Sequence, residues 1–292
     1  MRKQNYLNNK DMLKEIHKSK LSYCYVLDDE YSRFDVIVES IDDITNSDVI
    51  QTAKENRARQ LSNKAYEEAY FTWYDNEARK QSQKPKQINY KVDPETIDEK
   101  DLIFRVMTFD HIPLEPGRKN KPKTEADKHA KCNFPPFKHY AYIQDELKEC
   151  LRSHWEGGLD NGHFNVQHGA ITNNLAKMFL KLCERYSMRS NWRGYTYVDE
   201  MRSHALLQLS QIGLQFNELK SENPFAYYTA AVTNSFTRVL NLEKRNQNIR
   251  DDLLQEAGQM PSWTRQIEHE MAERAKWDEK SDKERKEHGF NV

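Results

Sequence analysis

The stretch from residue 192 to 254 constrains the fold of this chain more than any other part. Between Tyr197 and Phe216, apolar residues recur mostly every three or four positions, which predicts a helix with one buried face. A second helix is expected from the Asn223-Pro224 junction to about Leu254, because asparagine caps helices well and proline suits their first turn. A pair of consecutive helices is therefore the organising element of the sequence.

The second predicted helix changes its chemistry along its length. It begins with Phe225, Tyr227 and Tyr228, and it becomes basic and rich in amides from Arg238 to Arg250. Aromatic rings stack on unpaired bases, whereas amides and arginines reach base edges and phosphates. This order suits a junction between melted and paired DNA. The alternative is an aromatic-anchored helix pair with a solvated, charged end.

The remaining pattern predicts a mainly α fold with an α+β amino-terminal module. Further elements are expected as an opening helix within residues 1–20, strands at Ser22–Leu27, Phe34–Val38 and Asp101–Phe109, and helices at 47–82, Ala170–Ser187 and from Ser262 onward. We expect the helix at Ala170–Ser187 to pack against the helix that begins at Tyr197.

Four segments follow from this pattern. They are an α+β module of unknown role at 1–142, a linker with a short helix and turns at 143–169, a helical domain at 170–257, and a charged carboxyl-terminal helix and tail at 258–292.

Composition limits the partners that the chain can have. Of its 292 residues, 37% are hydrophobic and 31% are charged, and the net charge is −1. Any binding of nucleic acid must therefore come from local patches of charge. No apolar run is long enough to span a bilayer, and we expect no membrane association. The four cysteines lack paired spacing, which predicts reduced thiols in a cytoplasmic protein.

Two further features of the sequence bear on whether the chain binds a metal or is an enzyme. His129, Cys132 and His139, with His111 or Cys150 as a fourth ligand, could form a metal site, but their spacing is not that of structural zinc sites, and we predict no metal or cofactor. No nucleophile or phosphate-binding motif is present, so we expect no enzyme, although a metal-dependent DNA-processing enzyme remains a rival hypothesis.

An acidic block extends from Leu27 to Ile50, with eight Asp or Glu residues and one Arg. Such a block is usually a solvated surface, and the alternative is a DNA-mimicking or autoinhibitory face.

Residues 170–254 resemble region 2 of bacterial sigma factors, and more closely the late-transcription sigma factors of T-even-type phages and cyanophages. The resemblance covers under a third of the chain. It is carried by Asn191-Trp192-Arg193-Gly194-Tyr195-Thr196-Tyr197, Asp199-Glu200-Met201, Gln208-Leu209, Gly213-Leu214-Gln215-Phe216, Asn223-Pro224-Phe225-Ala226-Tyr227-Tyr228-Thr229, and Phe236-Thr237-Arg238 leading to Glu243-Lys244.

The resemblance implies a helical bundle that binds the clamp helices in the largest subunit of the host RNA polymerase core and melts an A/T-rich minus-ten-type promoter. It implies action in the cytoplasm of the infected bacterium. The implied core-binding residues are Glu200, Ser203, His204 and Gln208. The implied DNA-binding residues are Phe225, Tyr227, Tyr228, Asn234, Ser235, Arg238, Asn241, Lys244, Arg245 and Asn248.

The sequence departs from this family in several places. Ala231 and Val232 stand where primary sigma factors have a tryptophan pair, His204 replaces a usual acidic residue, and no helix-turn-helix follows residue 254. Phage late sigma factors reach a sliding clamp through an apolar tail and use a phage co-activator. Phe290 and Val292 are the apolar residues of the tail here. The alternative function is a polymerase-binding regulator or inhibitor without promoter recognition.

Overall fold

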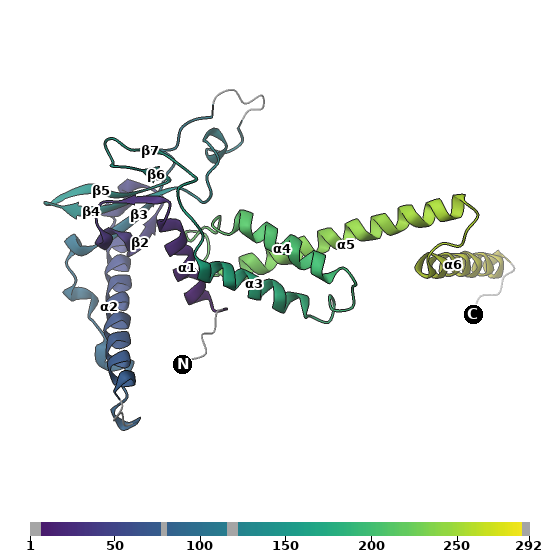
Figure 1. The fold of residues 1–292 in the computed structure, drawn as a ribbon, viewed down its shortest axis with the longest axis horizontal. Coiled ribbons are helices and arrows are strands. Elements are labelled where there is room, and N and C mark those ends of the chain that lie inside the picture. Colours follow the sequence, from purple (N-terminus) through teal and green to yellow (C-terminus); the bar gives the residue numbers. More distant parts are fainter. Residues whose placement is uncertain (1–6, 77–80, 116–121, 288–292) are drawn as a thin grey trace.

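The computed structural model describes residues 7–76, 81–115 and 122–287. It shows a sheet-containing amino-terminal half, a helical bundle beside it, and a long helix that extends away from both (Figure 1). The predicted fold class, mainly α with an α+β amino-terminal module, is confirmed. The elements are α1 (Asn9–Leu21), β1 (Cys24–Val26), β2 (Val36–Val38), α2 (Ser47–Asp75), β3 (Ile103–Met107), β4 (Phe137–Ile143), β5 (Glu146–Ser153), β6 (Trp155–Glu156), β7 (His163–Phe164), α3 (Asn173–Ser187), α4 (Val198–Ile212), α5 (Pro224–Glu256) and α6 (Trp263–Glu287).

The main sheet has the strand order β1-β5-β4-β3-β2. Only β2 and β3 pair in parallel, with Val36 opposite Phe104, and α2 lies in the connection between them. The other pairs are antiparallel, and Cys24 of β1 lies opposite Ser153 of β5. The strands predicted at Ser22–Leu27, Phe34–Val38 and Asp101–Phe109 correspond to β1, β2 and β3.

The short helix expected in the 143–169 linker is wrong. Strand β5 occupies Glu146–Ser153 and forms a hairpin with β4, turning through Gln144 and Asp145 at φ values of 56° and 63°. Leu147 and Leu151 are four residues apart among charged neighbours, which imitates a helical period. Pairing with both β1 and β4 overrides that local preference.

The two faces of the sheet have different partners. Phe104 and Val106 of β3 share a hydrophobic cluster with Ala53 and Ala58 of α2. Alternate residues of a strand point to opposite faces. Phe137 of β4 therefore joins the cluster on the other face, which includes α1 and the helical bundle.

Helices α3, α4 and α5 share their core with α1 and the sheet. One cluster of buried side chains runs from Met12 and Ile16 of α1, through Phe137 and Leu151, to Val239 of α5. The predicted boundaries at 142/143 and 169/170 thus separate segments that share a single core.

A buried ion pair also joins the module to the bundle. The Lys20 ammonium of α1 donates to both carboxylate oxygens of Glu218, at 2.7 and 2.8 Å, and to the Phe216 carbonyl at 2.7 Å. The Lys20 and Glu218 side chains are only 1% and 7% exposed. Asn9 Oδ1 accepts a hydrogen bond from Phe225 N, 3.2 Å away, at the start of α5. Helix α1 therefore fixes the loop between α4 and α5.

The last helix, α6, follows a capped turn at the far end of α5 (Figure 1). The buried Asp251 carboxylate accepts hydrogen bonds from Ser262 N at 2.8 Å and Ser262 Oγ at 2.7 Å. Among the described helices, none is both long enough and apolar enough to cross a membrane.

Candidate nucleic-acid interface

Helix α5 carries its polar side chains on one exposed stripe. The residues of this stripe are spaced by three or four, as residues on one helix face must be. They are Asn234, Arg238, Asn241, Arg245 and Asn248, and all five are exposed, as is the neighbouring Lys244. Three amides and two guanidinium groups thus follow one another along the helix, with their donors available to a partner.

The opposite face of α5 is buried in the bundle. Tyr228, Val232, Phe236 and Val239 are each at most 2% exposed. Two predicted DNA-binding residues, Tyr228 and Ser235, lie on this buried face. The prediction that their side chains contact DNA is therefore wrong. Residues 228, 232, 235 and 239 share a face because they too are spaced by four, three and four.

Tyr228 has a structural role. Its hydroxyl donates to the Gly213 carbonyl at the end of α4, and its ring meets that of Phe179 edge-on with centroids 4.9 Å apart. Burial raises the pKa of Tyr228, so its hydroxyl stays a protonated donor. Ser235 is 8% exposed and lies beside this core.

Phe225 and Tyr227 are half-buried at the amino-terminal end of α5. Tyr227 packs edge-on against Phe216 with centroids 5.6 Å apart. Each ring therefore has one side held by the core and part of its surface accessible. Such support reduces the conformational entropy that a ring loses when a base stacks on it.

The four predicted core-binding residues lie along α4. Glu200, Ser203 and His204 are exposed, and Gln208 is half-buried. Leu207 lies on the same stripe and is 56% exposed. Leu207 was not among the predicted residues, although its position four residues after Ser203 and three after His204 was a sufficient signal.

The histidine and cysteine residues of the metal hypothesis are held by separate partners. His139 Nε2 accepts from Arg105 Nε at 2.9 Å, so His139 Nδ1 is the atom that donates to the Tyr31 carbonyl at 2.8 Å. Both ring nitrogens of His139 are therefore occupied. His129 Nδ1 lies 3.0 Å from the Ile112 carbonyl, and Cys132 donates to the Ala130 carbonyl.

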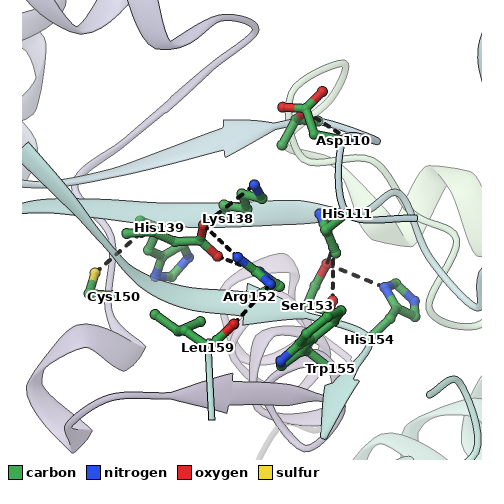
Figure 2. Close-up of polar contacts among 12 residues, drawn as sticks. Asp110, His111, Lys138, His139, Cys150, Arg152, Ser153, His154, Trp155 and Leu159 are labelled. Atoms are coloured by element: carbon green, nitrogen blue, oxygen red, sulfur yellow. Dashed lines mark hydrogen bonds and ion pairs between the residues drawn. The ribbon is translucent and has the colours of Figure 1, made fainter. Parts of the chain in front are cut away.

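The two optional ligands are also engaged. Figure 2 shows Cys150 directed at the backbone of His139 and His111 directed at Ser153. Burial raises the pKa of the Cys150 thiol to about 12 and lowers that of His111 to about 4. Within the described residues, no three His, Cys, Asp or Glu side chains converge as metal ligands.

Several carboxylates of the acidic block have structural partners. Asp35 is buried, accepts Ile103 N at 2.9 Å and pairs with Arg33 at 2.8 Å. Asp43 accepts Ser40 N in a capping box at the start of a short 3-10 turn. These contacts favour local structure over a continuous face that imitates DNA.

Comparison of the chain with protein-family models, with curated proteins and with solved structures finds no match. The functional interpretation therefore depends on the residues themselves and on their arrangement.

Proposed function

We propose that this chain is a late-transcription sigma factor of a bacteriophage, acting in the cytoplasm of the infected host. It binds the RNA polymerase core of the host and recognises and melts an A/T-rich minus-ten-type promoter element. The observation that supports this most is the order of groups along α5: supported aromatic rings at its start, then an exposed stripe of amides and arginines. In this proposal the chain is not an enzyme and needs no cofactor.

The proposed contacts with DNA follow that order. Arg238, Asn241 and Arg245 contact the duplex, because amides and guanidinium groups form directed hydrogen bonds with base edges and phosphates. Asn234, Lys244 and Asn248 extend the same contact. Phe225 and Tyr227 stack on the bases that separate, at about 1–3 kcal/mol per base. Tyr228 and Ser235 hold α5 against the bundle.

The proposed contact with the polymerase lies on α4. The exposed Leu207 has polar neighbours on α4. Ser203, His204 and Gln208 lie next to it, and Glu200 lies two turns earlier on the same side of the helix. In many interfaces a few central residues carry most of the binding energy, and the contacts around them exclude water. The clamp helices of the largest subunit are the proposed partner. A contact between the carboxyl-terminal tail and a sliding clamp belongs to the same proposal, and Phe290 and Val292 lie outside the described residues.

Promoter-directed transcription and permanganate footprinting with host core polymerase test this proposal. We expect the wild-type chain to open DNA near a minus-ten element, and Tyr227→Ala to reduce opening because a stacking ring is lost. Tyr228→Phe is the matched control, since it keeps the buried ring and removes only a hydroxyl that faces Gly213.

A second pair of variants separates DNA recognition from polymerase binding. Arg238→Ala should weaken promoter binding and leave core binding unchanged, whereas Leu207→Ala should weaken core binding. Tight core binding without an open complex on any A/T-rich template would reject the sigma proposal and favour a polymerase-binding regulator.

A further inference from the structure

Helix α3 and the turn after it carry a row of basic side chains. Residues 173–193 contain five Lys or Arg and one acidic residue, Glu184, in a chain with 45 basic and 46 acidic residues overall. The basic residues follow one another at intervals of four: Lys177, Lys181, Arg185, Arg189 and Arg193. We name this row the α3 ridge. Lys181 is half-buried and the other four are exposed.

The row of basic residues extends past the end of α3 into the turn that follows it. α3 ends at Ser187, and Arg193 N donates to the Arg189 carbonyl at 3.1 Å, so these two arginines lie in a separate turn. Four residues of helix advance about 6 Å, so Lys177, Lys181 and Arg185 follow one another along α3 at close, regular steps. Like charges four residues apart destabilise a helix. Among the described residues, no carboxylate lies within ion-pair distance of Lys177, Arg185, Arg189 or Arg193 to offset this repulsion.

The ridge is attached to the candidate DNA-reading helix. Tyr186 lies on α3 next to Arg185, and its hydroxyl is 2.7 Å from Thr233 Oγ1 of α5. The Tyr186 ring also meets Phe236 edge-on with centroids 5.1 Å apart. Arg189 lies over the Tyr186 ring, 4.3 Å from its centroid. Tyr186 thus anchors α3 to α5 at the level of Thr233 and Phe236, and the ridge residues Arg185 and Arg189 flank this anchor.

We propose that the α3 ridge binds the phosphate backbone of duplex DNA, as a contact additional to the α5 stripe. A row of exposed cations suits the duplex, which presents one negative charge per about 1.7 Å of its axis. Contacts of this kind position a protein without reading sequence. The identity of this duplex as promoter DNA rests on the proposed function, and the binding itself does not.

The dependence of duplex binding on salt tests the ridge directly. The full-length chain is titrated onto a short fluorescein-labelled duplex of random sequence, without polymerase, and anisotropy is followed over a series of NaCl concentrations. The ridge variant is Lys177→Gln/Arg185→Gln/Arg193→Gln. Each lost phosphate contact reduces the slope of log K against log salt by about 0.9, so the slope should become shallower by about 2.7. If affinities converge at 1 M salt, binding at about 0.15 M falls roughly 100- to 200-fold.

The control variant removes the same charge elsewhere. Lys64, Lys86 and Lys91 are exposed on the amino-terminal module, and changing all three to Gln should shift the slope by less than one contact. A second variant, Lys177→Arg/Arg185→Lys/Arg193→Lys, keeps the charges and should keep the wild-type slope, which separates a loss of charge from a loss of fold.

Three results would overturn the inference. These are equal slopes for the ridge variant and the lysine control, absence of duplex binding by the wild type at the lowest salt, or loss of polymerase affinity with an unchanged DNA slope. The last result would assign the ridge to an acidic protein surface. Failure of promoter opening with intact ridge-dependent duplex binding would reject the sigma proposal alone.

Discussion

Replacing Lys20 with methionine should strongly destabilise the junction between the amino-terminal module and the bundle. In the wild type, the Lys20 ammonium is 2.7–2.8 Å from both Glu218 oxygens. Burial by itself would raise the pKa of Glu218, but the His17 ring, with Nε2 3.4 Å from the carboxylate, and the charges of Lys20 and Arg105 outweigh burial and hold the pKa well below its usual range. Glu218 is therefore ionised, and Lys20→Met leaves its charge buried.

The magnitude follows from the burial of both partners. Removing one member of a buried ion pair costs about 3–5 kcal/mol, because the other charge stays in a poorly solvated site. Domains of this kind are stable by about 5–15 kcal/mol, so the loss is a large part of the total. Urea unfolding followed by far-UV circular dichroism measures it.

The double variant Lys20→Met/Glu218→Leu distinguishes a stranded charge from lost packing. It removes both charges and should recover much of the stability, retaining a cost of about 1–3 kcal/mol because the Phe216 carbonyl loses its donor. A cost below about 1 kcal/mol for Lys20→Met, or a double variant as unstable as the sum of the two single variants, would refute this reasoning.

Three other predictions follow from buried contacts. Gly213→Ala should lower the unfolding free energy by about 1–3 kcal/mol in urea, since the added Cβ would lie 2.7 Å from both the Leu209 carbonyl and the Phe179 ring; Gly194→Ala is the control, with no atom within 4 Å. Burial lowers the pKa of His154 to about 3, so only the unfolded chain binds this proton between about pH 6.5 and 3. Stability should therefore fall as pH falls through that range, by an amount on the order of 5 kcal/mol. His154→Asn, which tolerates the left-handed backbone at φ 53°, should flatten that pH dependence in urea titrations. Asp251→Ala should release α6 and speed proteolysis between residues 256 and 263, whereas Asp252→Ala, which removes only an exposed pair with Arg265, should change the cleavage rate little.

The helices were predictable because their signals are local. Asn223 and Pro224 mark the start of α5, and the apolar period after Tyr197 marks α4, although this helix ends at Ile212 and not at Phe216. The residues of the α5 stripe were predicted as DNA contacts from residue type and from the family resemblance, and the structure shows that they are exposed. Tyr228 was misassigned because an aromatic residue can serve as a core residue or as a stacking platform, and residue type alone does not separate these roles. Tyr228 precedes the apolar Val232 by four residues, and this spacing indicates that both side chains lie on the buried face of α5.

The parts that could not be predicted depend on contacts between distant segments. Strand β5 becomes a strand only because Leu151 pairs opposite Val26 of β1 and His139 of β4. The burial of Lys20 depends on Glu218, which is 198 residues away in the sequence. Lys20 follows Met12 and Ile16 at intervals of four, which places it on the buried face of α1, unlike the solvated lysines at positions 10, 14 and 18, but nothing nearby in the sequence identifies Glu218 as its partner.

The shared core has a consequence for the synthesis of this protein. Met12 and Ile16 are completely buried in a cluster that includes Val239. A ribosome adds about 5–20 residues per second, so roughly 10–45 s separate the appearance of α1 from that of its last partners in α5. During this interval the apolar face of α1 has only part of its native contacts. Apolar surface that stays exposed in this way favours aggregation until the helices of the bundle are made.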